Sequence, residues 1–112
     1  MIRVTVSTRR GVLYRIAAEG HGSRGPDGLS AVCAAVSALL KGVGLSLLDN
    51  PGCTVEGTIE DRGLFDLTVT RCDDERWLRG LGDLTCTILR EIARQWPREI
   101  VFAVNEENSN GT

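Results

Sequence analysis

The chain repeats one order of patterns: two segments that alternate apolar and polar residues, followed by a segment with apolar residues at helical spacing. Residues 2–6 alternate, an Arg-Arg-Gly turn follows at 9–11, and alternation resumes at residue 12. Period-two alternation is typical of half-buried strands, so the pattern predicts a β-hairpin. A helix is predicted next, from Ser30 to about Leu48, because the apolar residues there have helical spacing: Val32, Val36, Leu39, Leu40, Val43 and Leu47.

The same order then recurs. Residues 53–59 and 65–69 alternate around an Asp-Arg-Gly turn, and a helix is predicted from about Asp74 to Gln95. Its predicted buried stripe consists of Trp77, Leu81, Leu84, Ile88, Ile92 and Trp96. A final strand is predicted at Ile100–Val104.

The resulting order, ββαββαβ, limits the architecture. A chain of 112 residues supports one hydrophobic core. We therefore predict a single α+β domain over residues 1–105, with two layers: a mostly antiparallel sheet and two helices packed on one of its faces. The polar residues 106–112 are expected to form a disordered tail.

Composition excludes several classes of protein. Apolar residues make up 42% and charged residues 25%, as in ordinary soluble domains. The net charge of -2 lacks the excess of basic residues that is typical of nucleic-acid-binding proteins. No apolar run is expected to reach the roughly 20 residues that cross a bilayer, and the N-terminus has no signal-peptide pattern. We expect a cytoplasmic protein with neither nucleic acid nor membrane as a partner.

The cysteines are spread along the chain with no Cys-x-x-Cys pair. There are four, at positions 33, 53, 72 and 86, and a single histidine, His21. This spacing fits neither a zinc site nor a disulfide framework. We therefore predict reduced thiols, as is usual in the cytosol, with no metal and no cofactor.

The segment from residue 20 to residue 40, GHGSRGPDGLSAVCAAVSALL, carries the candidate chemistry. It places His21 in a glycine-rich loop after the first hairpin and Cys33 in the first turn of the first helix. Cysteine proteases need a thiol that attacks a carbonyl and an imidazole that accepts its proton. The loop glycines, which we predict to form a substrate loop, permit the chain to fold back: Gly20, Gly22, Gly25 and Gly28.

Three further residues are candidates for supporting roles. Ser30 is a suitable N-cap and would place Cys33 at the third helical position, where the helix dipole stabilises a thiolate. Ser37 follows Cys33 by four residues, so it would bond either to the imidazole or to the Cys33 carbonyl. Asp27 would contact substrate or keep the loop solvated. The simpler alternatives are that Cys33 is a small buried residue and that His21 is a solvated loop residue.

The sequence resembles the Prp family of ribosomal-processing cysteine proteases. The resemblance lies in Gly20-His21, Gly25 and VCAAVSAL at 32–39, after a β-hairpin in a chain of this length. It implies a compact α+β fold, His21 as general base and Cys33 as nucleophile. It also implies removal of a short N-terminal extension from a large-subunit ribosomal protein, by cleavage after an aromatic residue, and a homodimer.

One position departs from the family pattern. The residue three before the cysteine is usually aspartate in the family, and here it is Ser30. Serine can cap the helix but supplies no negative charge to the imidazolium. Asp27 could take that role, so the third catalytic member stays open. Gly22 also replaces a commoner alanine and adds freedom to the loop.

Two other functions remain compatible with the sequence. The first is a non-catalytic, ribosome-associated binding or assembly module with the same fold. The second is a reversible thiol switch at Cys33, which would need a resolving cysteine close by. The sequence does not show whether Cys53, Cys72 or Cys86 approaches it.

Overall fold

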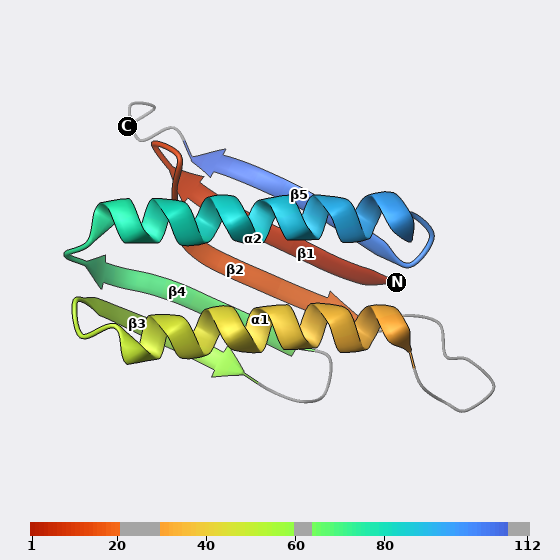
Figure 1. Ribbon diagram of the computed structural model, residues 1–112, viewed down its shortest axis with the longest axis horizontal. Helices are drawn as coiled ribbons and strands as arrows, with labels where there is room; N and C mark the ends of the chain where they lie inside the picture. The colour runs from red at the N-terminus through yellow and green to blue at the C-terminus, as the bar shows by residue number, and fades with distance from the viewer. Residues whose placement is uncertain (21–29, 60–63, 108–112) are drawn as a thin grey trace.

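The computed structural model describes residues 1–20, 30–59 and 64–107. Its element order is ββαββαβ, as predicted (Figure 1). The elements are β1 (Ile2–Arg9), β2 (Val12–Gly20), α1 (Ala31–Asp49), β3 (Cys53–Ile59), β4 (Leu64–Cys72), α2 (Glu75–Gln95) and β5 (Ile100–Glu107).

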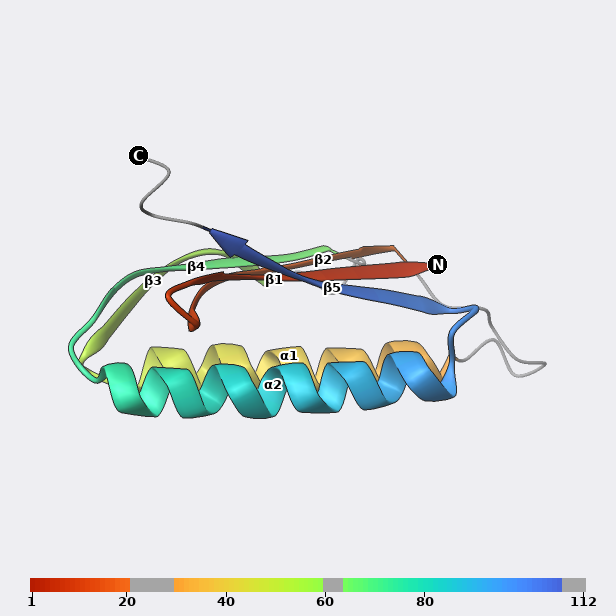
Figure 2. The ribbon, with the colours of Figure 1, turned by 90° about the horizontal axis from the view of Figure 1, so that it is seen from above.

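The strands form one five-stranded sheet in the order β3-β4-β2-β1-β5. Three of the four strand pairs are antiparallel, and β5 runs parallel to β1 with Ile100 opposite Ile2. The sheet is therefore mixed, though mostly antiparallel. Both helices cover the same face of the sheet, which confirms the two-layer α+β prediction (Figure 2).

The core lies between the helices and the central strands. The predicted stripe of α1 is confirmed except at Leu39, which is only partly buried. The largest fully buried side chains come from β1, β2 and both helices: Leu13, Ile16, Leu47, Leu89, Val4, Val6, Val32 and Thr85.

The buried face of α2 differs from the prediction. Leu84 and Trp96 were expected inside but are 60% and 37% exposed, whereas Gly82 and Thr85 are buried. A Cβ added at Gly82 would lie 3.1 Å from the Cβ of Leu13, so the helix approaches the hairpin closely at this point. The Thr85 hydroxyl donates to the Leu81 carbonyl at 2.7 Å, which satisfies it inside the helix. Close packing therefore selects small side chains that a purely apolar pattern overlooks.

The first hairpin turns at Arg10 and Gly11, as predicted. Their φ angles are 55° and 76°, both left-handed, as a two-residue turn of type I′ requires. Arg79 of α2 donates to the Arg10 carbonyl at 3.1 Å. The turn is thereby attached to the helix layer.

Strand β5 extends to Glu107, beyond the predicted end at Val104. Glu106 accepts a hydrogen bond from the backbone N–H of Gly11 at 3.0 Å and another from the Thr8 hydroxyl. Glu107 pairs with Arg9 at 2.7 Å. These contacts explain why Glu106 and Glu107 belong to the strand and not to a tail. Residues 108–112 lie outside the described part of the chain.

Helix α1 reaches the length and apolar character of a membrane-spanning helix, with 19 residues. The expectation that no segment does so was therefore wrong. The buried residues of α1, among them Val36, Leu40 and Leu47, pack into the same core as the strands. A core helix that covers a sheet can have the same length and composition, and α1 is part of the helical layer of this domain.

Cys53 and Cys72 form a disulfide, which corrects the prediction that all four thiols are reduced. The two residues are 19 apart in sequence but lie directly opposite each other on β3 and β4, with Cα atoms 4.0 Å apart. Strand register brings them together, and spacing in the sequence alone does not reveal register.

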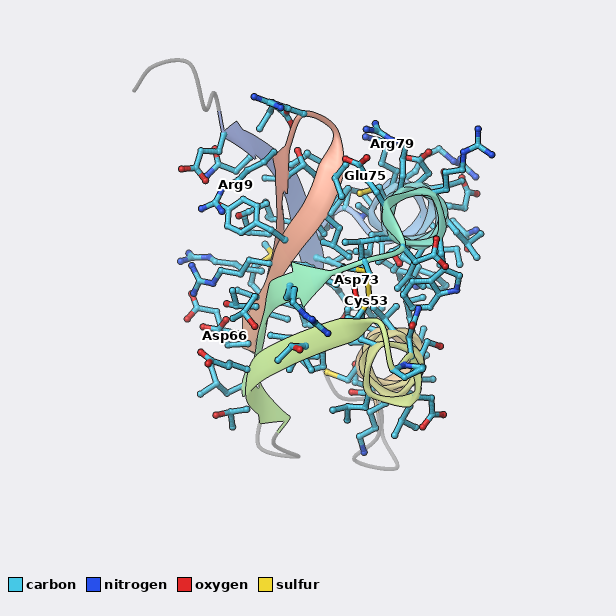
Figure 3. All side chains as sticks on the ribbon, turned by 90° about the vertical axis from the view of Figure 1, so that its left-hand side faces the viewer. Arg9, Cys53, Asp66, Asp73, Glu75 and Arg79 are labelled. Carbon is cyan, nitrogen blue, oxygen red and sulfur yellow. A yellow bond between two sulfur atoms is a disulfide. The ribbon has the colours of Figure 1, made fainter. Side chains whose placement is uncertain are left out.

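An ion pair between Arg15 and Asp66 joins β2 to β4. The guanidinium donates to both carboxylate oxygens, at 3.0 and 2.7 Å. Asp66 projects from the sheet on the side away from the helices (Figure 3). The hydrogen bonds from Arg15 lower the pKa of Asp66, and partial burial opposes this effect.

This lowered pKa gives a pH prediction. Because the folded-state pKa of Asp66 is below its unfolded value, the stabilisation is present above that value and is lost as pH falls through the folded pKa. Both side chains are 40–47% exposed, so we expect the loss to be less than about 1 kcal/mol. Urea unfolding between pH 5 and 2 measures it. Asp66→Asn should reduce the fall in the free energy of unfolding between pH 5 and pH 2. Asp49→Asn, at the end of α1, serves as control. If the free energy of unfolding falls equally in wild type and in Asp66→Asn over this range, the prediction is contradicted.

Candidate active site

Helix α1 begins with a side-chain cap at Ser30, as predicted. Ser30 has an extended backbone, and its hydroxyl oxygen accepts the N–H of Cys33 at 3.1 Å. The Ser30 carbonyl accepts the N–H of Ala34 at 3.0 Å and starts the helical ladder. Cys33 therefore occupies the third helical position, where it is half-buried and packs against the core.

The cap decides which backbone donors the helix start can offer to a ligand. The N–H of Cys33 already donates to Ser30, so it is not available to an oxyanion while that cap is formed. The N–H groups of Ala31 and Val32 have no acceptor within the helix, because the carbonyls four residues earlier precede it. These two amides are the candidate donors beside Cys33. They also lie at the positive end of the helix dipole.

The last residue of β2, Gly20, needs to be glycine. Its φ is 96°, and a Cβ at this position would lie 2.1 Å from the carbonyl oxygen of Met1. Figures 1 and 2 both show that β2 ends at the end of the domain where α1 begins. The sheet and the helix therefore bring Gly20 and Cys33 to the same end of the molecule.

Some predicted site residues lie outside the described residues. They are His21, Gly22, Gly25, Asp27 and Gly28. His21 follows Gly20 directly in the sequence. Of the predicted supporting residues that are described, Ser30 caps the helix, and Ser37 is exposed one turn beyond Cys33.

The other cysteines are in different environments. Cys53 and Cys72 are bonded to each other, so in this state neither serves as the resolving cysteine of a thiol switch at Cys33. Cys86 is buried, and burial raises the pKa of its thiol; Asp83 adds to this rise, while Arg90 opposes it. Of the two cysteines outside the disulfide, Cys33 is therefore the more accessible to solvent. Across residues 1–20, 30–59 and 64–107, no three His, Cys, Asp or Glu side chains form a cluster that could hold a metal ion.

The cap gives a prediction. Ser30→Ala is expected to lower the free energy of unfolding by about 1 kcal/mol, because it removes the acceptor for the Cys33 N–H. Ser30→Asp keeps an acceptor and should stay within about 0.5 kcal/mol of wild type. Chemical denaturation of the three proteins measures this. Equal stability of wild type and Ser30→Ala would show that the cap contributes nothing.

Comparison with known proteins identifies the family. The model of the family described as "Cysteine protease Prp" matches residues 1–101. No curated protein matches the chain.

Several solved structures share the fold, and three of them are compared here with this chain. SMU.848 from Streptococcus mutans superposes with a TM-score of 0.79 at 23% identity, over 96% of both chains. The ribosomal processing protease Prp from S. aureus, with a covalently linked product peptide, gives 0.77 at 22% identity, over 96% of this chain and 100% of that one. The same S. aureus protease with a substrate peptide gives 0.73 at 19% identity, with the same coverage. Because the family model covers nearly all of the described fold, the chain belongs to the Prp family of cysteine proteases.

Proposed function

We propose that this cysteine protease removes a short N-terminal extension from a large-subunit ribosomal protein, with Cys33 as nucleophile and His21 as general base. The observation that carries the proposal is the position of Cys33 in the capped first turn of α1, at the end of the domain where β2 ends at Gly20, the residue that precedes His21 in the sequence. The S. aureus relative, described as a ribosomal processing protease and bound to peptides, supports the substrate class. The proposed enzyme is cytoplasmic, as expected from the composition, and a homodimer, as the resemblance implies.

The chemistry runs in two stages. His21 accepts the proton of the Cys33 thiol, and the sulfur attacks the peptide carbonyl carbon, which forms a C–S bond and an oxyanion. The C–N bond then breaks, and His21 returns the proton to the leaving amine. A water molecule, activated by His21, attacks the thioester, and the sulfur leaves as the acid is released.

The helix start supplies the electrostatic part of this mechanism. The oxyanion would accept hydrogen bonds from the N–H groups of Ala31 and Val32, which the helix itself leaves without acceptors.

The test is a peptide that spans the N-terminal extension and first residues of the ribosomal protein from the same genome. We expect a single cut after an aromatic residue, detected by mass spectrometry. A matched peptide in which that aromatic residue is replaced by aspartate should remain intact. Binding of the native peptide without any cleavage would favour the non-catalytic binding module instead.

The role of His21 has a separate test. Alkylation of Cys33 by iodoacetamide at pH 7 is expected to slow about tenfold in His21→Ala, because the thiol loses its proton acceptor. Peptide mapping assigns the label, and the buried Cys86 should stay unlabelled in the folded protein. Equal labelling rates in both proteins would remove His21 from the mechanism without excluding Cys33 as nucleophile.

A further inference from the structure

A cleft lies where β2 and β4 separate. The ladder between these strands begins at the pair Arg15–Thr68 and continues toward Gly20. The ladder does not extend beyond this pair among the described residues, and a cleft of ≈ 350 Å³ lies between the start of β2 and the end of β4. It is at the opposite end of β2 from Gly20, and hence far from the first turn of α1. Its lining is Arg9, Val12, Leu13, Tyr14, Val69, Thr70, Arg71, Cys72, Glu75 and Leu78.

The backbone of the cleft walls can bind amide groups. Segments 12–14 and 69–72 lie on opposite walls, outside the ladder that joins β2 to β4 among the described residues. Val12 and Leu13 pair with β1, and Val69, Arg71 and Cys72 pair with β3, whereas Tyr14 and Thr70 lie at irregular points of these two ladders and have no partner in either register. Leu13 is buried, so the open backbone of this wall is that of its neighbours. Strand edges of this kind present N–H and C=O groups that accept an extended, peptide-like ligand.

The side chains of the cleft carry both signs of charge. Arg9 pairs with Glu107 at 2.7 Å and Arg71 with Asp73 at 3.6 Å, yet the two arginine side chains remain 55% and 61% exposed. Both can therefore receive a carboxylate from a ligand. Glu75, in the first turn of α2, supplies a negative charge for an ammonium group. Arg9 and Glu75 come from opposite sides of the sheet, as their labels in Figure 3 show.

A disulfide forms part of the same wall. Cys72 lines the cleft, whereas its partner Cys53 is not among the described residues that do so. Because Cys72 lines the cleft and is partly exposed, it is the member of the disulfide that we expect a bound nucleophile to attack. The sulfur of Cys72 lies 3.5 Å from the Asp74 carbonyl, which can accept an S–H once the cysteine is reduced.

We propose that the cleft binds a small, zwitterionic, peptide-like thiol and that this thiol exchanges with the disulfide at Cys72. The volume is within the range of small-molecule sites. The ligand's carboxylate pairs with Arg71, its ammonium with Glu75, and its amides with the open strand edges. This site is separate from Cys33 and does not depend on the proposed peptidase mechanism.

The ligand thiolate attacks the sulfur of Cys72, a new S–S bond forms, and the Cys53–Cys72 bond breaks. Cys53 leaves as a thiolate and takes a proton from solvent. A second thiol molecule can then attack the mixed disulfide, which releases the oxidised ligand dimer and reduces Cys72. The fold is expected to survive, because Asp73 still donates to the Gly52 carbonyl at 2.8 Å and the β3–β4 ladder continues to Ile59.

Glutathione is a suitable probe, since it has a thiol, amides, carboxylates and an ammonium group. The oxidised protein is mixed with glutathione or with its dimethyl ester at low salt, quenched in acid and mapped by mass spectrometry. We expect the adduct on Cys72, formed at least about tenfold faster by glutathione than by the ester after correction for thiolate concentration. Arg71→Gln should remove most of this difference, and Arg98→Gln, in the turn before β5, should leave it unchanged.

A second variant removes the dependence on disulfide stability. In Cys53→Ser, Cys72 is a single thiol, and oxidised glutathione should add to it faster than the oxidised dimethyl ester does. An adduct on Cys53, equal rates for the charged and esterified probes, or failure of Cys53 and Cys72 to form a disulfide would each overturn the proposal. These results are read from adduct mass and not from peptide cleavage, so they are distinguishable from failure of the peptidase proposal.

Discussion

Replacing Cys33 with alanine is expected to reduce peptide cleavage by at least about a thousandfold, because no sulfur remains to form the thioester. Cys33→Ser should be nearly as inactive, since its hydroxyl is a far weaker nucleophile in a site arranged for a thiolate. Single-turnover cleavage of the ribosomal-protein peptide, followed by mass spectrometry, measures the loss.

Controls separate this loss from misfolding. Cys33 is half-buried at the start of α1, so Cys33→Ser should keep the thermal midpoint within a few degrees of wild type. Cys86→Ala removes a different cysteine, which lies in α2. The folded fraction of this variant should cleave the peptide at the wild-type rate. A Cys33→Ala protein that still cuts the peptide at the wild-type rate would end the nucleophile assignment, whatever its stability.

Gly57→Ala is expected to destabilise the fold by about 3 kcal/mol or more, the largest stability effect of any variant considered. Gly57 has a φ of 143°, and a Cβ at this position would lie 1.9 Å from the carbonyl oxygen of Asp66. That carbonyl belongs to the backbone of β4, so relief requires the two strands to move apart. Urea unfolding monitored by circular dichroism measures the change.

Gly42→Ala is the matched control. Gly42 lies in α1, where an added Cβ would meet nothing within 4 Å, and glycine costs a helix roughly 0.5–1 kcal/mol relative to alanine. The same substitution should therefore stabilise the protein at residue 42 and destabilise it at residue 57. Destabilisation of similar size at both positions would show that the strand contact at Gly57 is not the cause.

Local patterns were sufficient for most elements. The alternation at 2–6 and the Arg-Arg-Gly sequence predicted the first hairpin, because side-chain period and turn conformation depend on neighbouring residues. Ser30 could be predicted as the cap of α1 because its hydroxyl accepts the N–H of Cys33, which is only three residues away in the sequence. The family resemblance of segment 32–39 agrees with the family match over residues 1–101.

Long-range packing explains the errors. The stripe predicted on α2 included Leu84 and left out Gly82. The close contact between Gly82 and Leu13 of β2 decided which face of the helix is buried. The strand at 100–104 was predicted too short, because the hairpin turn that binds Glu106 is far away in the sequence.

The sequence alone determined the order of strands and helices, the cap at Ser30 and the family, since each depends on residues close together along the chain. Tertiary structure decided that Cys53 and Cys72 meet, that β5 pairs in parallel with β1, and that Gly20 and Cys33 share one end of the domain. Those relations depend on strand register and on the packing of the two layers, which are set by contacts between residues distant in sequence.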